Sequence, residues 1–389
     1  MTGKTLSSYF SLNRRYYRSV NLVRDLDKLD SVQGYVPTER SADALRRILA
    51  ALTEKRSHRA WTITGVYGTG KSAFAHYLLS LCAGHDNPVK QEALTVAEQA
   101  FPKDSPALKA IQENIPAQGL MRAAATGQRE PLSWTVARAL KSCAARFWKD
   151  RDKPDFWPQF TDWEIELDSR SPDISNQQVL HVLKRMVQAA ETPLLLVVDE
   201  LGKALEYAAH NQGVNDLYLL QQIAELEIEG DHQVYFLGLL HQSFAGYSER
   251  LAAVEQSEWS KIQGRFEDIP FAESPGQMTR LIGQAIDQSQ ADPILYAIRR
   301  GGDDWYKALA PILTESDVSS DVLAAAYPLH PITALVLPLL CTRYAQNDRS
   351  LFTFLTSEEP YGLQEFLVSV TVEGEQVPTL KLHQLYDYF

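Results

Sequence analysis

Residues 65–72, Gly-Val-Tyr-Gly-Thr-Gly-Lys-Ser, constrain the fold more than any other segment of the chain. They satisfy the pattern G-x-x-x-x-G-K-[S/T] at every fixed position. A β-prone run at 61–64 precedes them, and a segment with helical periodicity at 72–82 follows. Strand, glycine-rich loop and helix in this order form a phosphate-binding loop, because backbone N–H groups and the positive end of the helix dipole then face the phosphates. The sequence therefore predicts a nucleotide site within an α/β fold.

The side chains of this loop have separate predicted roles. Lys71 is expected to reach the β and γ phosphates, and the Ser72 hydroxyl is expected to ligate Mg²⁺. The alternative, a plain glycine-rich turn, leaves Lys71 and Ser72 unexplained. The predicted cofactor-binding residues of the loop are Gly65, Val66, Tyr67, Gly68, Thr69, Gly70, Lys71, Ser72 and Ala73.

An acidic pair follows a strongly apolar run. Residues 194–198 are all Leu or Val, which is typical of a strand buried on both faces of a parallel sheet. Asp199, directly after this strand, is the second predicted metal ligand. Glu200 is the predicted catalytic residue that activates the attacking water. An exposed turn or a helix N-cap is the alternative explanation of the pair.

Further features give the chain a family resemblance. A second apolar strand is expected at 234–240, a Gly-Arg-Phe segment occurs at 264–266, and only helical patterns follow Pro275. Together with the two motifs, they resemble an AAA+ type ATPase of the additional-strand class over roughly residues 34–355. The resemblance implies an α/β P-loop NTPase core whose parallel sheet has the order 5-1-4-3-2, followed by an α-helical lid domain.

The end of the 234–240 strand is where related ATPases place a polar sensor beside the γ phosphate. Gln242 is preferred to His241 for this catalytic role, because a neutral amide orients water without depending on pH. A polar strand end that caps the next helix through Ser243 is the alternative.

Arg265 lies in the segment with which AAA+ ATPases deliver an arginine to a neighbouring subunit's nucleotide. Such a cation stabilises the charge that builds on the phosphoryl oxygens. An intramolecular salt bridge to Glu267 or Asp268 is the competing interpretation. If Arg265 works in trans, the protein must form an oligomer to be active.

Two more sites follow from the resemblance. Tyr35, Val36 and Pro37 resemble the segment that covers the adenine in AAA+ and related STAND ATPases, and apolar groups with backbone amides suit a flat base. Simple loop packing is the alternative there. Arg349 is the predicted second sensor of the lid, with Arg343 as the other candidate, although surface helices carry arginines in any case.

We expect three parts in the chain. They are an N-terminal arm (1–34), a P-loop α/β core with a helical insertion at about 84–190 (35–274), and an α-helical lid (275–389), for which a truncated C-terminus is one interpretation. The arm carries Arg14, Arg15, Arg18 and Arg24, and a strap packed on the core is favoured over a basic interaction arm. Residues 149–175, rich in Trp, Asp and Pro, predict a surface excursion.

Composition limits the partners and the compartment. A net charge of -11 opposes non-specific binding of nucleic acid, which stays possible at a local patch only. Cys82, Cys143 and Cys341 lack paired spacing and are expected to be buried free thiols. Without a signal region or an apolar run of membrane length, a cytoplasmic protein is expected.

Two stretches, 199–203 and 330–352, look similar to the large ATPases of bacterial anti-phage defence islands, such as those of BREX-type systems. We therefore predict a subunit that binds and hydrolyses ATP with Mg²⁺, as a switch or motor in a homo-oligomer or larger defence complex. A slow STAND-like signalling switch and a DNA-translocating motor are alternatives. A P-loop phosphotransferase is disfavoured because no acceptor motif is recognisable.

Overall fold

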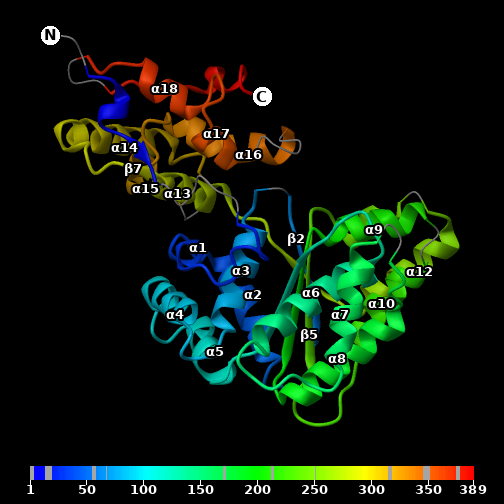
Figure 1. The fold of residues 1–389 in the computed structure, drawn as a ribbon. Helices are drawn as coiled ribbons and strands as arrows, with labels where there is room; N and C mark the ends of the chain where they lie inside the picture. The colour runs from blue at the N-terminus through cyan, green and yellow to red at the C-terminus, as the bar shows by residue number, and fades with distance from the viewer. Residues whose placement is uncertain are drawn as a thin grey trace. The chain divides into compact units, whose positions relative to one another are not determined.

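The computed structural model describes residues 4–13, 20–54, 58–66, 68–169, 172–211, 214–249, 251–313, 318–344, 351–373 and 377–389. The chain forms two compact units (Figure 1). The larger unit contains Val20–Val66 and Gly70–Ala272, and the smaller contains Met1–Ser19, Tyr67–Thr69 and Glu273–Phe389. The segment predicted as an N-terminal arm is therefore divided between the two units.

A five-stranded parallel sheet forms the centre of the larger unit, with the strand order β3-β4-β5-β2-β6. Counted along the chain within this sheet, the order is 5-1-4-3-2, so the predicted α/β fold and topology are confirmed. The register pairs Thr64 with Leu240 and Val198 with Gly238. The carboxyl ends of β2, β4 and β5 consequently meet at one edge. The strands are β2 (Ala60–Thr64), β3 (Met121–Thr126), β4 (Leu194–Asp199), β5 (Val234–Leu240) and β6 (Glu267–Pro270).

Strands β4 and β5 are buried along their whole length. Because side chains alternate between the faces of a sheet, Leu194 and Leu196 pack in one hydrophobic cluster while Leu195 and Val197 pack in another. Helices cover both faces (Figure 1). On one face lie α2 (Glu39–Ala50), α3 (Lys71–Leu81), α4 (Pro88–Ala100) and α5 (Pro106–Asn114); on the other lie α6 (Leu132–Phe147), α8 (Asn176–Ala190), α10 (Val214–Ala224) and α12 (Ala253–Gln263).

The start of α2 is set by a capping interaction. The helix begins at Glu39, because Thr38 is the N-cap. The Thr38 hydroxyl accepts a hydrogen bond from the Ser41 N–H (3.2 Å), and the Ser41 hydroxyl accepts one from the Thr38 N–H (2.7 Å). This reciprocal arrangement is a capping box, in which Ser41 takes the third helical position.

Most of the described residues in 149–169 and 172–175 are exposed or half-buried, as a surface excursion predicts, but a few aromatic residues of the segment belong to the core. The segment contains α7 (Pro158–Leu167), and Phe156, Phe160 and Trp163 are at most 5% exposed. Phe160 makes edge-to-face contacts with Phe156 and Trp163, with ring centroids 5.9 Å apart in both pairs. The spacing of these aromatic residues is that of one helix face, a pattern which the abundant Asp and Pro of the segment obscure.

The C-terminal part of the smaller unit is mainly helical. Its helices are α13 (Pro275–Ala285), α14 (Leu295–Leu309), α15 (Ser320–Ala325), α16 (Pro331–Tyr344), α17 (Leu351–Thr356) and α18 (Leu363–Ser369). The prediction of helices alone is wrong at β7 (Ile286–Asp287), which pairs antiparallel with β1 (Ser11–Leu12). Two residues are too few to give a period-2 pattern in the sequence.

The N-terminal segment 4–13 is packed as a strap within this unit, since Leu6, Phe10 and Leu12 are at most 6% exposed in its core. Arg14, Arg15 and Arg18 lie outside the described residues.

The three cysteines are free and buried, as predicted. Burial raises the pKa of the Cys82 thiol to about 12 and that of Cys143 to about 11. Within the described ranges, no helix has both the length and the apolar character that crossing a membrane requires.

Replacing the buried Trp163 should test whether the aromatic cluster is a structural core. Trp163→Ala is expected to lower the free energy of unfolding by about 3–5 kcal/mol, because it removes a large buried ring and leaves a cavity. Ile165→Ala on the same helix is the control, since Ile165 is 68% exposed, and it should change stability by less than about 0.5 kcal/mol. Urea denaturation followed by circular dichroism measures both, and equal losses would contradict the buried arrangement.

Candidate nucleotide site

The glycine-rich loop connects β2 to α3. Its first residue is tied to the sheet, because the Gly65 N–H donates to the Leu240 carbonyl (3.1 Å) at the end of β5. Gly68 (φ 78°) and Gly70 (φ 86°) have left-handed backbones, which other residues adopt only at a cost. A Cβ at Gly70 would meet nothing within 4 Å, so the conformation, and not crowding, requires glycine there. Tyr67 lies outside the described residues.

Lys71 turns its side chain back into the loop. Its ammonium donates to the carbonyls of Gly65 (2.5 Å) and Val66 (2.7 Å), and the residue is only 5% exposed. Burial lowers the pKa of Lys71 to about 8, although the carboxylates of Asp199 and Glu200 oppose this shift. The loop thus holds a cation in a place with little solvation, where an anion would be strongly favoured.

Asp199 and Ser72 come together from different elements. Asp199 ends β4 and is 8% exposed, and the Ser72 hydroxyl at the start of α3 hydrogen-bonds its carboxylate. The Glu200 N–H also donates to Asp199 Oδ1 (2.8 Å). Burial raises the pKa of Asp199, while these two hydrogen bonds and the charge of Lys71 act in the opposite direction. The structure therefore brings the two predicted metal ligands into contact.

Glu200 occupies a strained position at the same edge. It is the N-cap of α9 (Leu201–His210) with φ 51°, and its side chain makes no capping hydrogen bond. A positive φ in a residue other than glycine costs on the order of 1–3 kcal/mol and is found mainly at functional sites. The Glu200 carboxylate is 27% exposed and forms an ion pair with Lys203. The N-cap position therefore explains where Glu200 lies, but it does not explain why a glutamate side chain is present there.

Two glycines that the sequence analysis did not single out shape this turn. The Gly127 N–H donates to the Asp199 carbonyl (2.7 Å), and a Cβ at Gly127 would lie 2.5 Å from the Glu200 carbonyl oxygen. A Cβ at Gly238 on β5 would lie 2.5 Å from the Leu201 side chain. Gly127 needs glycine because its neighbour is backbone, whereas at Gly238 a larger residue would displace the Leu201 side chain. Gly127 directly follows β3 and Gly238 lies within β5, and these locations are the signal that the sequence offers.

The polar end of β5 contains both sensor candidates. His241 is half-buried, and burial together with the charges of Lys71 and Lys203 lowers its pKa to about 4. His241 is consequently neutral near pH 7, so its titration is no reason to prefer the amide. Gln242 is exposed, and Ser243 caps α11 (Phe244–Ser248) by accepting from the Gly246 N–H (3.3 Å). The choice of Gln242 as sensor stays a prediction.

Arg265 has a different ion-pair partner from those predicted. It pairs with Glu225 (2.6 Å), and both side chains are about half exposed. Glu267 accepts from side chains of α2 and β2, and Asp268 accepts from two threonines of β2. The competing interpretation, an ion pair within the chain, is therefore observed with a partner other than Glu267 or Asp268, because these carboxylates attach β6 to its neighbours.

The position of Arg265 in the fold bears on its predicted role. It lies two residues before β6, whose residue Glu267 is in register with Trp61, whereas the glycine-rich loop follows Thr64. Strands of a parallel sheet share their direction, so Arg265 lies at the opposite edge of the sheet from the loop of its own chain. The role of Arg265 toward a nucleotide of a neighbouring subunit stays a prediction.

The remaining predicted contacts lie in other parts of the chain. Tyr35 stacks on Tyr77 of α3, with ring centroids 4.4 Å apart, and Val36 and Pro37 are half-buried. Their role in binding the base stays a prediction. Arg343 is exposed in the last turn of α16, and Arg349 lies outside the described residues.

No protein-family model matches the chain, and no curated protein matches it. Among solved structures, the chain is similar to the ORC2 protein of Aeropyrum pernix, described in ADPNP-ADP complexes, with 15% sequence identity and a TM-score of 0.37. The match covers 81% of this chain and 71% of that chain. A likeness this distant carries no argument, so fold and function are drawn from the residues of the chain itself.

The lowered pKa of Lys71 predicts pH-dependent binding of ATP. Bound phosphates favour the ammonium form, so the pKa of Lys71 is higher in the complex than its value of about 8 in the free protein. The affinity for MgATP is then highest below about pH 8 and decreases as the pH rises above this value. Binding in this higher range is accompanied by uptake of protons. Calorimetry of MgATP binding in buffers of different protonation enthalpy measures both effects.

Lys71→Arg is the control for this titration, because a guanidinium stays protonated throughout the range. Any affinity that remains in this variant should be independent of pH. An affinity of the unmodified protein that stays constant from pH 7 to about 9 would show that Lys71 does not contact the phosphates.

Proposed function

We propose that this chain binds ATP with Mg²⁺ and hydrolyses it, as an AAA+-type subunit that acts as a conformational switch or motor. The observation that supports this proposal is the convergence of four side chains at one edge of the sheet. Lys71 and Ser72 begin α3 directly after the loop, Asp199 ends β4, and Glu200 follows it. A cation for phosphates, a metal-binding pair and a water-activating carboxylate are the groups that phosphoryl transfer to water requires.

The donor set fits Mg²⁺. This ion keeps several waters and is usually bound by one or two protein oxygens together with substrate phosphates. Ser72 and Asp199 supply one hydroxyl and one carboxylate in direct contact. In the described part of the chain, no group of three or more His, Cys, Asp and Glu residues could hold a metal ion alone. When bound, Mg²⁺ would neutralise charge on the β and γ phosphate oxygens.

The residues of the chain then have distinct tasks. Lys71 neutralises the phosphates at the start of α3, where the helix dipole adds to its charge. Glu200 accepts a proton from the attacking water. Lys203, its ion-pair partner, orients the Glu200 carboxylate. Because Glu200 also begins α9, a change in its contacts on hydrolysis would be transmitted to that helix. This link favours a switch or motor over a simple hydrolase.

The biological role rests on sequence resemblance alone. Of the two stretches that resemble anti-phage defence ATPases, 199–203 lies at the proposed site, and residues 345–350 of the other are outside the described part of the chain. We infer a defence role from this resemblance, with a homo-oligomer as the active form because Arg265 lies at the far edge of the sheet. A DNA-translocating motor is distinguished by stimulation of ATP hydrolysis on addition of DNA.

The trans role of Arg265 predicts that two inactive variants restore each other. Arg265→Ala should bind ATP normally but lose hydrolysis by about two orders of magnitude or more, as for a lost arginine finger. Lys71→Ala should fail to bind ATP. In a mixed assembly, Arg265 of the second variant can serve the intact loop of the first. Steady-state ATP hydrolysis, measured against protein concentration with and without DNA, should therefore partly recover on mixing.

Glu225→Ala is the control, since it breaks the ion pair of Arg265 but keeps the arginine. A half-exposed pair contributes little to stability, so this variant should stay active. If it instead reproduces the Arg265→Ala defect, or if mixing gives no recovery, Arg265 acts within its own chain. An unmodified protein that does not hydrolyse ATP at all would overturn the proposed function itself.

A further inference from the structure

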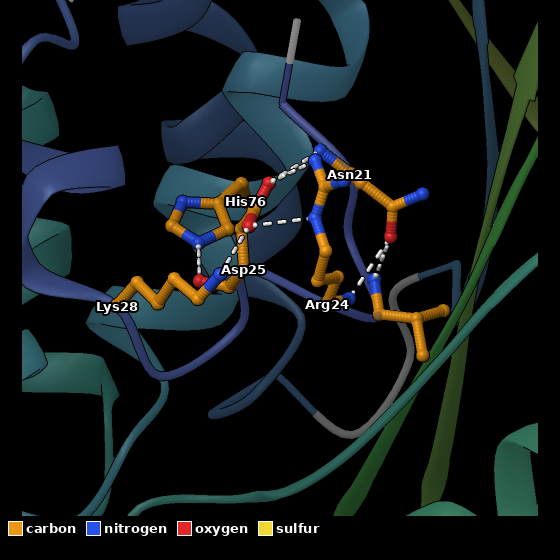
Figure 2. A network of polar contacts seen from close by, with 6 residues as sticks. Asn21, Arg24, Asp25, Lys28 and His76 are labelled. Carbon is orange, nitrogen blue, oxygen red and sulfur yellow. Dashed lines mark hydrogen bonds and ion pairs between the residues drawn. The ribbon is translucent and has the colours of Figure 1, made fainter. Parts of the chain in front are cut away.

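A turn near the N-terminus is attached to the helix that follows the glycine-rich loop. Figure 2 shows the side chains of Arg24 and Lys28 converging on Asp25, with the His76 ring beside it. Residues 21–28 form this turn, and His76 belongs to α3. The turn is part of the larger unit, as is α3.

The Asp25 carboxylate is the centre of the 21–28 turn. Its side chain is 2% exposed, yet it accepts from the Asn21 N–H (3.0 Å), from Arg24 Nε (3.2 Å) and from Lys28 Nζ (3.2 Å). A buried carboxylate is tolerated only when charges and hydrogen bonds compensate its desolvation. These contacts fix the fold of the turn, and they are local, because Asn21, Arg24 and Lys28 lie within four residues of Asp25.

The backbone of Asp25 connects the turn to α3. Its carbonyl accepts a hydrogen bond from His76 Nε2 (2.7 Å) as well as one from the Lys28 N–H (3.0 Å). A carbonyl can only accept, so Nε2 carries the proton. His76 is 1% exposed, and burial lowers its pKa, which keeps the ring neutral. A further contact, from Arg122 on β3 to Asp27 (2.6 Å), holds the turn from the side of the sheet.

The other end of the same stretch contacts the next residue of α3. Tyr35 stacks on Tyr77, with an interplanar angle of 24°, and the Tyr77 hydroxyl donates to the Ala93 carbonyl (3.0 Å). Between the two contacts lies α1 (Leu29–Gln33), whose Val32 is fully buried. The stretch from Asp25 to Tyr35 is therefore held at both ends by consecutive residues of one helix. Along α3, Tyr77 is six residues, or about 9 Å, from Lys71.

We propose that Asp25 and His76 are positioning residues that set the predicted base-binding segment 35–37 against α3 and so determine the affinity for the nucleoside part of ATP. This inference rests on the proposed function and on the predicted role of segment 35–37. The phosphates are held by the loop and Lys71, which the 21–28 turn does not contact in any described interaction. Loss of the His76 hydrogen bond would leave the loop intact but would lower the fraction of molecules in which segment 35–37 is correctly placed. The apparent affinity for ATP decreases in proportion to this fraction, whereas the affinity for a bare polyphosphate stays unchanged.

The test compares two ligands and three variants. Calorimetry with Mg²⁺ measures Kd for ATP and for inorganic tripolyphosphate. His76→Leu, which keeps the volume but removes the donor, is expected to weaken ATP binding by roughly fivefold and to leave tripolyphosphate unchanged. His76→Gln retains an N–H donor and should restore most of the affinity for ATP. His210→Leu on α9 is the control, since it also removes a 2.7 Å histidine contact to a backbone carbonyl.

The outcomes separate the inference from the proposed function. An unmodified protein that binds neither ligand would contradict the nucleotide site. If it binds both, but His76→Leu weakens both equally or neither, then His76 does not position the base-binding segment. Binding of tripolyphosphate also reports that a variant is folded. Should His76→Leu not fold, the Arg24→Gln and Lys28→Gln double variant changes only half-exposed side chains around Asp25. This double variant should weaken the binding of ATP and leave the binding of tripolyphosphate unchanged. An unchanged affinity for ATP would overturn the inference.

Discussion

The buried ammonium of Lys71 is the interaction on which the site depends. Its hydrogen bonds to two loop carbonyls hold the loop closed around a cation, and the carboxylates of Asp199 and Glu200 supply the opposing charge. Strand β4 is two strands away from β2, about 10 Å, so this balance requires the strand order that the chain adopts. If β4 occupied another place in the sheet, the cation would lack its acidic counterpart.

Close packing of the backbones allows groups at the ends of β2 and β4 to interact across the strand that lies between them. Gly238 on β5, the strand in between, leaves room for Leu201, and Gly127 lets the end of β3 approach the turn of Glu200. Glu200, the proposed general base, consequently lies in a turn in which its own φ is positive. Strain in this turn is offset by the buried sheet behind it, since β4 and β5 are buried throughout. Rigid strands thus position the strained turn of the proposed site.

Local patterns predicted most of the sheet. The Leu194–Val198 run and the glycine-rich loop each identify an element and its end. A strand buried on both faces requires consecutive apolar residues, and a left-handed backbone favours glycine. The contacts of Arg265 could not be predicted, since its partner Glu225 is 40 residues away and nothing in either segment encodes the pairing. The pairing of β1 with β7, over more than 270 residues, left no pattern either. Within 149–175, the aromatic residues have helical spacing, but the content of Asp and Pro led to the prediction of a surface excursion.

Glu200→Gln tests whether Glu200 activates the attacking water at the proposed site. Steady-state ATP hydrolysis and ATP binding should be measured on the variant, with Glu206→Gln on the same helix as control. We predict unchanged ATP binding with turnover lowered by about a hundredfold or more, because an amide cannot accept the proton of the attacking water. Hydrolysis at the rate of the unmodified protein would contradict the account.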